Sequence, residues 1–209
     1  MLAALEVSPS ALASLRDKGW AEQIQVDTRP DVTKETLAQA PLAANAEQRA
    51  AIQAIQDADS FTPFLLDGIT GSGKTELYLH YLKEHLQESQ QALVLVPEIN
   101  LTPQTVARFR HYFGDRIAVW HSALNDSERL LTWLRIRRGE PVILVGTRSA
   151  VLLPYTDLGT LIVDAEHDSS YKQGEGFRYS GRDVAVYRAH LNNCPVILGS
   201  ATPSLESYN

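Results

Sequence analysis

The 209-residue sequence contains a single cysteine, Cys194. One cysteine excludes an internal disulfide framework and a multi-cysteine zinc cluster within these residues, which fits the reducing cytoplasm. The sequence also lacks the roughly 20 consecutive apolar residues that a membrane-spanning helix requires. Its first fifteen residues have neither a basic start nor a continuous apolar stretch, unlike a secretory signal. We therefore expect a soluble, cytoplasmic protein without a membrane partner.

An excess of positive charge is absent too, since the formal net charge is -6 at pH 7. This balance argues against a surface that is basic everywhere, so nucleic-acid binding would depend on a local strip of Lys, Arg and backbone amides. With 44% hydrophobic residues, the chain is long enough for one sizeable domain and a small appendage.

From Pro63 onward, short apolar runs alternate with amphipathic stretches. The apolar runs are "PFLLDGI", "QALVLVPE", "RIAVWHS", "PVILVGT", "LGTLIVDAE" and "CPVILGSAT". The amphipathic stretches between them include "TELYLHYLKEHLQES", "TPQTVARFRHYF", "DSERLLTWLRIRRGE" and "GRDVAVYRAHLNN". This alternation is typical of an α/β fold with a parallel sheet that helices cover on both faces.

The first 44 residues have a different pattern. Within residues 1–27, "SPSALASLRDKGWAEQIQV" predicts a helix followed by a short strand, an order that ends many winged-helix modules and also many ordinary helix-to-strand turns. Residues 28–44 contain two prolines and no durable period, which indicates a linker. The main domain is expected at residues 45–209.

The string "GITGSGKT", Gly68 to Thr75, matches the phosphate-loop pattern and lies between a predicted strand and a predicted helix. Backbone N–H groups at such a helix start favour the phosphates of ATP. Lys74 would reach the β and γ phosphates, and Thr75 would ligate Mg²⁺. The nucleotide-binding candidates in this loop are Gly68, Thr70, Gly71, Ser72, Gly73, Lys74 and Thr75. A glycine-rich turn with an accidental lysine is the alternative, which the flanking strand and helix disfavour.

The string "LIVDAEHD", residues 161–168, supplies an acidic partner for that loop. Asp164 ends an apolar strand, where it would hold Mg²⁺ through water, although Asp also starts turns after strands. In proteins that pair a phosphate loop with such an aspartate, the next residue is normally the carboxylate that activates water. Here it is Ala165.

Four further strings follow predicted strands, at the carboxyl edge where open α/β sheets bind ligands. They are "VPEINLTPQT", "HSALNDSER", "GTRSAV" and "GSATPS". With the phosphate loop and "DAEH", their order resembles the first motor lobe of superfamily 2 helicases, a RecA-like P-loop NTPase lobe. These strings and "HDSSYKQGEGFRYSGRDVAVYRAH" are similar, from about Asn45 to the C-terminus, to the PriA family of primosomal replication-restart helicases.

The resemblance implies an ATP-hydrolysing 3′-to-5′ DNA helicase that binds forked and single-stranded DNA and helps restart stalled forks. By family, its partners are single-strand-binding protein and other primosome proteins. Residues 1–27 would then be the end of a winged-helix module. The family's fork-binding domain, second motor lobe and zinc-binding cysteines are not in this chain, so we expect a piece of a longer protein, without the zinc site.

The resemblance also implies roles for single residues. Gln48 matches the glutamine that reads adenine, with a solvated helix start as the equally weighted alternative. Ser200 and Thr202 match the motif that couples nucleotide to DNA. The residues that match motifs gripping the backbone of the tracked DNA strand are Pro97, Glu98, Thr102, Gln104, Thr147, Arg148 and Ser149. For Thr102 and Ser149, a capping or turn role is the alternative.

Residues 171–179, "YKQGEGFRY", match the family's aromatic-rich loop, which couples DNA binding to ATP use. Aromatic rings and cations together suit stacking of single-stranded bases. The candidates are Tyr171, Lys172, Phe177, Arg178 and Tyr179. The alternative is a loop that its aromatics pin onto the core. Phe177 stands where the family usually has Trp, which should weaken stacking.

The family has Asp-Glu-Glu-His where this chain has Asp-Ala-Glu-His. General-base catalysis contributes ~10² to 10⁴ in rate, whereas nucleotide and Mg²⁺ binding rest on residues that are all present. Glu166 is not expected to substitute, because neighbouring side chains on an extended segment point to opposite faces. The second motor lobe, where such motors are expected to carry the arginine that stabilises transition-state charge, is absent as well. For both reasons we expect binding of ATP without efficient hydrolysis.

Two other functions fit parts of this pattern. A nucleotide-dependent DNA-binding or regulatory module would bind without any turnover. A P-loop kinase would carry a lid and acceptor-site residues in place of "GTRSAV" and "GSATPS".

Overall fold

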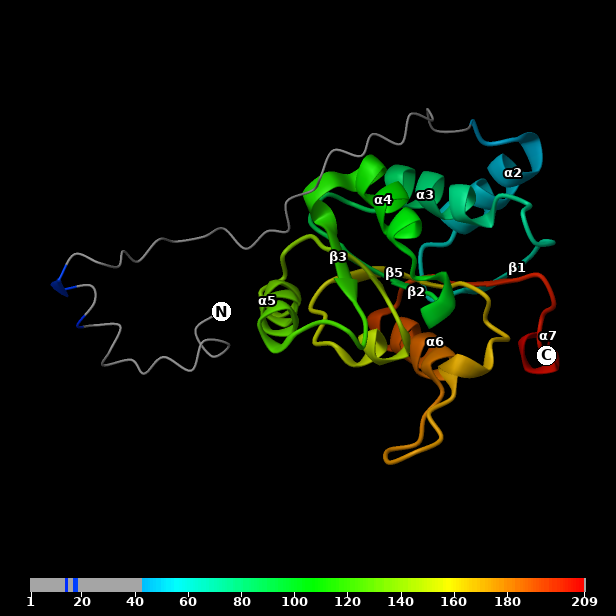
Figure 1. Cartoon of the computed structure of the whole chain (residues 1–209). Helices are drawn as coiled ribbons and strands as arrows, with labels where there is room; N and C mark the ends of the chain where they lie inside the picture. Colours follow the sequence, from blue (N-terminus) through cyan, green and yellow to red (C-terminus); the bar gives the residue numbers. More distant parts are fainter. Residues whose placement is uncertain (1–13, 15–16, 19–42, 209) are drawn as a thin grey trace. The chain divides into compact units, whose positions relative to one another are not determined.

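The computed structural model describes residues 14, 17–18 and 43–208 (Figure 1). The chain divides into two compact units, Met1–Thr36 and Leu37–Asn209. Nearly all of the predicted winged-helix segment, residues 1–27, and of the predicted linker, residues 28–44, lies outside the described residues, so both stay predictions. The fold described below is that of the second unit.

Within the described residues, six strands form one sheet in the order β1-β6-β5-β2-β4-β3. They are β1 (Pro63–Asp67), β2 (Gln91–Leu95), β3 (Ile117–Trp120), β4 (Ile143–Gly146), β5 (Leu158–Val163) and β6 (Val196–Ser200). Every neighbouring pair is parallel. All six predicted strands are present, and the prediction of a parallel α/β sheet is confirmed.

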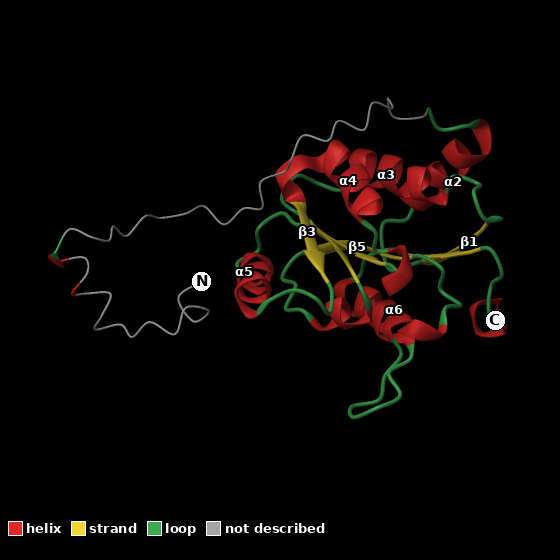
Figure 2. Ribbon diagram, in the orientation of Figure 1, coloured by secondary structure: helices red, strands yellow, loops and turns green. Residues whose placement is uncertain are grey.

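Helices cover both faces of this sheet (Figure 2). On one face lie α2 (Ala46–Gln56), α3 (Lys74–His85) and α4 (Pro103–Phe113), and on the other lie α5 (Asp126–Arg137) and α6 (Gly181–Asn192). Strand β2 shows why both faces are apolar: Ala92 and Val94 pack into the cluster that contains α2, α3 and α4, while Leu93 and Leu95 pack into the opposite cluster. A strand buried on both faces must be apolar throughout.

Shorter elements complete the described domain. They are the 3₁₀ helices η2 (Glu98–Asn100), η3 (Gly114–Arg116), η4 (Arg148–Leu152) and η5 (Ser169–Tyr171), and the short helix α7 (Leu205–Tyr208). No helix in the described part of the chain is both long and apolar enough to cross a membrane.

Two helices begin at capping boxes that the sequence encodes. Asn45 and Gln48 bond reciprocally at the start of α2, as do Asn125 and Glu128 at the start of α5. Such caps satisfy N–H groups that would otherwise lack a partner, at ~0.5–2 kcal/mol each.

The parallel arrangement brings the segments after all strands to one edge. Neighbouring strands then join neighbouring motifs: the Gly68 N–H donates to the Ser200 carbonyl at 3.0 Å, and the Glu166 N–H donates to the Gly199 carbonyl at 2.9 Å. The phosphate loop, "DAEH" and "GSAT" therefore lie side by side at the ends of β1, β5 and β6.

Candidate functional site

The phosphate loop turns sharply between β1 and α3. Gly71 and Gly73 have φ angles of 80° and 85°, which glycine adopts at little cost. Gly73 is the N-cap of α3, and none of the described side chains caps that helix. The first N–H groups of α3 therefore lack a side-chain acceptor, as in a helix start that receives an anion.

Lys74 folds back over this loop. Its Nζ donates to the Gly68 carbonyl at 2.5 Å and to the Ile69 carbonyl at 3.2 Å. The ammonium group thus lies within the loop, held by neutral acceptors that a phosphate could replace.

Gln48 combines two contacts. Its Oε1 accepts the Asn45 N–H at 2.9 Å as part of the capping box, and its Nε2 donates to the Ser72 and Gly73 carbonyls at 3.3 Å. A Cβ on Gly73 would lie 2.6 Å from this Nε2. The side chain therefore starts a helix and also contacts the phosphate loop; its contact with adenine stays a prediction.

Asp164 follows β5, and its Oδ1 accepts a hydrogen bond from the Tyr78 hydroxyl at 3.0 Å. Burial raises the pKa of the Asp164 carboxyl above its usual value, although Tyr78 and Lys74 oppose that shift. Asp164 and Thr75 line one cavity of about 250 Å³. Carboxylate and hydroxyl oxygens are donors that suit Mg²⁺, so the two predicted metal ligands fit that ion.

Ala165 has a φ of 48°, one of two positive values at non-glycine residues in the described chain. Residues 164–167 form a turn, so the prediction of an extended segment there was wrong. The Ala165 carbonyl accepts the Asp168 N–H at 2.8 Å, which closes the turn. At this position the side chain is only a methyl group and cannot accept a proton.

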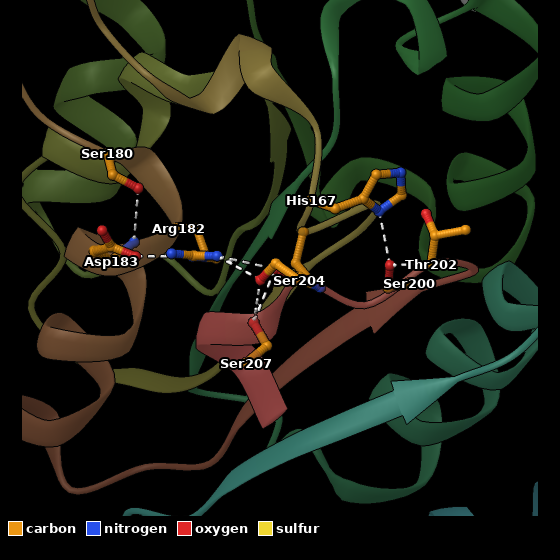
Figure 3. A network of polar contacts seen from close by, with 9 residues as sticks. His167, Ser180, Arg182, Asp183, Ser200, Thr202, Ser204 and Ser207 are labelled. Atoms are coloured by element: carbon orange, nitrogen blue, oxygen red, sulfur yellow. Dashed lines mark hydrogen bonds and ion pairs between the residues drawn. The ribbon is translucent and has the colours of Figure 1, made fainter. Parts of the chain in front are cut away.

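Glu166 is 2% exposed, and its carboxylate bonds to Arg182, Ser204 and Ser207, which are labelled in Figure 3. It accepts from Ser204 N at 2.8 Å, Ser204 Oγ at 3.0 Å, Ser207 Oγ at 2.9 Å and Arg182 at 3.1 Å. Burial alone would raise the pKa of Glu166, but these hydrogen bonds outweigh it and hold the pKa below its usual value. The carboxylate is therefore fully hydrogen-bonded to residues after β6 and at the start of α6.

The same turn contacts the "GSAT" segment through His167. Its Nδ1 lies 2.7 Å from Ser200 Oγ, and that hydroxyl also accepts the Thr202 N–H at 3.1 Å (Figure 3). Ser200 is fully buried, whereas Thr202 is exposed. Two motifs that are 33 residues apart in sequence thus share a direct contact.

The predicted DNA-contacting residues after β2 lie in or beside η2 and α4. Pro97 is buried, and Glu98 accepts the Ser122 hydroxyl at 2.5 Å. Thr102 caps α4 by accepting the Thr105 N–H at 3.2 Å, the alternative role considered for it. Gln104 is exposed on the first turn of α4.

The residues after β4 also make internal contacts. The Thr147 N–H donates to the Trp120 carbonyl at 2.9 Å, and Ser149 Oγ accepts the Trp120 indole N–H at 3.0 Å. Arg148 donates to the Ser170 and Lys172 carbonyls, both at 2.9 Å. Arg148 therefore holds the base of the 171–179 loop.

The two ends of that loop differ in exposure. Phe177 is 79% exposed, with Lys172 and Arg178 also exposed and the half-buried Tyr179 ring 6.0 Å from it. Tyr171 is only 1% exposed, and its hydroxyl donates to the Asp164 carbonyl at 2.6 Å. This buried position does not fit the stacking role predicted for Tyr171.

Sequence reasoning missed several residues of this edge: Tyr78, Arg182, Gly199, Ser204 and Ser207. A signal existed for two of them. Tyr78 follows Lys74 by four residues, so the two share a helix face. Gly199 lies inside an apolar strand, where glycine often marks a close approach.

The sequence of residues 45–209 matches the family described as DEAD/DEAH box helicase. The chain belongs to this family. Its DEAD/DEAH box domain spans all the described strands.

Curated relatives of this chain include replication restart protein PriA from several bacteria. The chain is 46% identical over 211 residues to that protein from Haemophilus influenzae, covering 98% of this chain and 29% of the relative. It is 44% identical over 208 residues to the Bacillus subtilis protein, covering 97% and 26%. The predicted resemblance to restart helicases is confirmed, and the chain spans less than a third of these relatives.

Solved structures give the same fold. The structure of RecG bound to a three-way DNA junction matches with a TM-score of 0.56 and 24% identity, covering 81% of this chain and 22% of RecG. The Pyrococcus furiosus Hef helicase domain matches with a TM-score of 0.54 and 18% identity, covering 78% and 34%. The expected RecA-like lobe is confirmed.

Proposed function

We propose that the described domain is the ATP-binding first motor lobe of a 3′-to-5′ DNA helicase that restarts stalled replication forks. The observation that carries this proposal is the meeting of Lys74, Thr75 and Asp164 at one edge of the sheet, where Thr75 and Asp164 share a cavity. The similarity to replication restart proteins supports the biological setting.

Each group would have its own role in holding the nucleotide. The N–H groups of residues 68–75 would receive the phosphates, Lys74 would pair with the β and γ phosphates, and Gln48 would read adenine. Thr75 and Asp164 would hold Mg²⁺, which neutralises phosphate charge when bound.

Hydrolysis is expected to be disabled at Ala165. No carboxylate at that position can orient and deprotonate water, and Glu166 is engaged by four hydrogen bonds elsewhere. The same observation favours the second candidate function, a nucleotide-dependent DNA-binding or regulatory module without turnover.

DNA would lie along the carboxyl edge toward β2 and β4. Among the predicted residues, the exposed Gln104 after β2 and the exposed Lys172, Phe177 and Arg178 in the loop after β5 are best placed to reach it. Forked and single-stranded DNA, single-strand-binding protein and other primosome proteins are the proposed partners, and residues 1–27 are the proposed winged-helix segment.

Nucleotide affinity measured by calorimetry tests the proposal. Wild type should bind ATP and ADP with Mg²⁺, and Lys74→Ala should bind at least about 10-fold more weakly, since a charged hydrogen bond contributes ~1.5–3 kcal/mol. Lys83→Ala, which removes an exposed lysine from the same helix, is the matched control and should bind like wild type. Equal affinity of the wild type and Lys74→Ala would refute the assignment.

A further inference from the structure

Tyr78 connects three motifs at the carboxyl edge. It lies on α3 one turn after Lys74, is 2% exposed, and donates its hydroxyl to Asp164 Oδ1 at 3.0 Å. The two residues are 86 positions apart in the sequence. A helix that starts at the phosphate loop therefore bonds directly to the carboxylate after β5.

Gly199 of "GSAT" makes room for this bond. A Cβ at Gly199 would lie 1.8 Å from the Tyr78 hydroxyl and 3.0 Å from its Cζ atom, so a larger residue would displace the ring. The φ angle of Gly199 is not among the positive values, so its backbone conformation does not require glycine. The close approach of Tyr78 accounts for the glycine instead.

The hydroxyl is well suited to remain a donor. Burial, reinforced by the nearby Asp164 carboxylate, raises the pKa of Tyr78 well above its usual value. A neutral tyrosine hydroxyl has one hydrogen to donate, and here the carboxylate receives it.

We propose that Tyr78 is a positioning residue that fixes the orientation of the Asp164 carboxylate beside Thr75, so that the two can share one Mg²⁺. This inference rests on the proposed nucleotide-binding function. Residues that hydrogen-bond a ligating carboxylate orient it, and their loss typically costs ~10–100-fold in metal affinity.

The chain offers a matched control on the same helix. Tyr81 is also fully buried, but its hydroxyl donates to Thr160 Oγ1 at 3.2 Å, away from Asp164. Tyr78→Phe and Tyr81→Phe each remove one buried hydroxyl, and only the first loses a bond to the carboxylate.

The experiment measures ATP affinity by calorimetry, once with Mg²⁺ and once with EDTA, for the full chain and both variants. The ratio of the two affinities is the gain from Mg²⁺. We expect Tyr78→Phe to lower this gain at least about 10-fold, with affinity in EDTA unchanged, and Tyr81→Phe to leave both unchanged. A general loss of stability would affect the two variants alike.

A second variant makes the test independent of how well Tyr78→Phe folds. Gly199→Ala displaces the hydroxyl without removing it, so it should also reduce the gain from Mg²⁺. If Tyr78→Phe and Gly199→Ala both showed the same gain in ATP affinity from Mg²⁺ as the wild type, the inference about Tyr78 would be overturned, and the proposed nucleotide-binding function would stand. A wild-type chain without any gain from Mg²⁺ would overturn the proposed function, and this inference with it.

Discussion

The two halves of the carboxyl edge use their motif residues differently. At the ends of β1, β5 and β6, side chains from separate motifs contact one another, as Tyr78 contacts Asp164 and His167 contacts Ser200. At the ends of β2 and β4, several motif residues instead bond to loop backbone, as Thr102 accepts the Thr105 N–H and Arg148 donates to the Ser170 and Lys172 carbonyls.

This difference shows that residues matched by a motif can have two roles, either forming a ligand site directly or supporting the loops around one. In the nucleotide half, Asp164 accepts the Tyr78 hydroxyl and lines one cavity with Thr75. In the DNA half, which also includes the 171–179 loop after β5, several matched residues hold loop backbone in place, and the exposed residues beside them remain accessible to a ligand. Arg148 and Phe177 illustrate the two roles, because the first anchors a loop and the second projects from it.

Glu166→Ala should give the largest loss of unfolding free energy, which measures how much the Glu166 network stabilises the nucleotide half. The change removes the buried carboxylate that pairs with Arg182, and breaking a buried pair costs ~3–5 kcal/mol of unfolding free energy. Asp183→Ala is the matched control, since Asp183 binds the same arginine but its side chain is 62% exposed. Its loss should stay below ~1 kcal/mol. Denaturant unfolding measures both, and equal losses would contradict the network's role.

The same network predicts a dependence on pH. Because the folded pKa of Glu166 lies below its unfolded value, ~4.3 for a free glutamate, the stabilisation is present above that pH and is lost as pH falls through the folded pKa. The difference in unfolding free energy between wild type and Glu166→Gln should therefore shrink below about pH 4. Asp164 and Asp168 titrate in both proteins, so they largely cancel. A difference that stays constant from pH 7 to pH 3 would argue against this carboxylate.

Arg148→Ala sharpens the comparison from the DNA half. The Ser170 and Lys172 carbonyls lose their donor, so the unfolding free energy should fall by ~1–3 kcal/mol and cleavage by protease within residues 171–179 should accelerate. Arg178→Ala removes an exposed arginine from the same loop, so it should weaken binding of single-stranded DNA without changing stability. A loss of stability in Arg178→Ala together with a loss of DNA affinity alone in Arg148→Ala would show that the roles of the two arginines had been assigned wrongly.

The smallest expected effects distinguish the two ends of the aromatic-rich loop. Phe177→Ala should weaken binding of a single-stranded oligonucleotide by ~1 kcal/mol and leave stability unchanged, because stacking on an exposed ring is lost. Tyr171→Phe should lower stability by ~1 kcal/mol through its lost bond to Asp164 and leave stacking intact. Fluorescence anisotropy and thermal unfolding measure the two quantities. Equal losses of DNA affinity would show that the Tyr171 hydroxyl, and not only the Phe177 ring, contributes to DNA binding.

Much of the fold could be predicted because apolar runs and amphipathic stretches are local features. The phosphate loop and Asp164 could be predicted because glycine, lysine and aspartate occur there in a recognised order. The Tyr78 and Tyr171 hydroxyls could not, because burial of an aromatic ring has the same sequence signature whether or not its hydroxyl meets a polar partner. The backbone at Ala165 was also missed, since alanine gives no sign of a positive φ.

The most direct test of the account concerns Ala165, in a protein extended to carry both motor lobes. Steady-state phosphate release is measured with saturating single-stranded DNA for the Ala165 form and for Ala165→Glu, with nucleotide affinity measured in parallel. We expect both forms to bind ATP, and the Ala165 form to hydrolyse it at least ~10²-fold more slowly, because only the water-activating carboxylate differs. Similar rates for the two forms would mean that another group is the base, and would contradict the account of a lobe that binds nucleotide without turning it over.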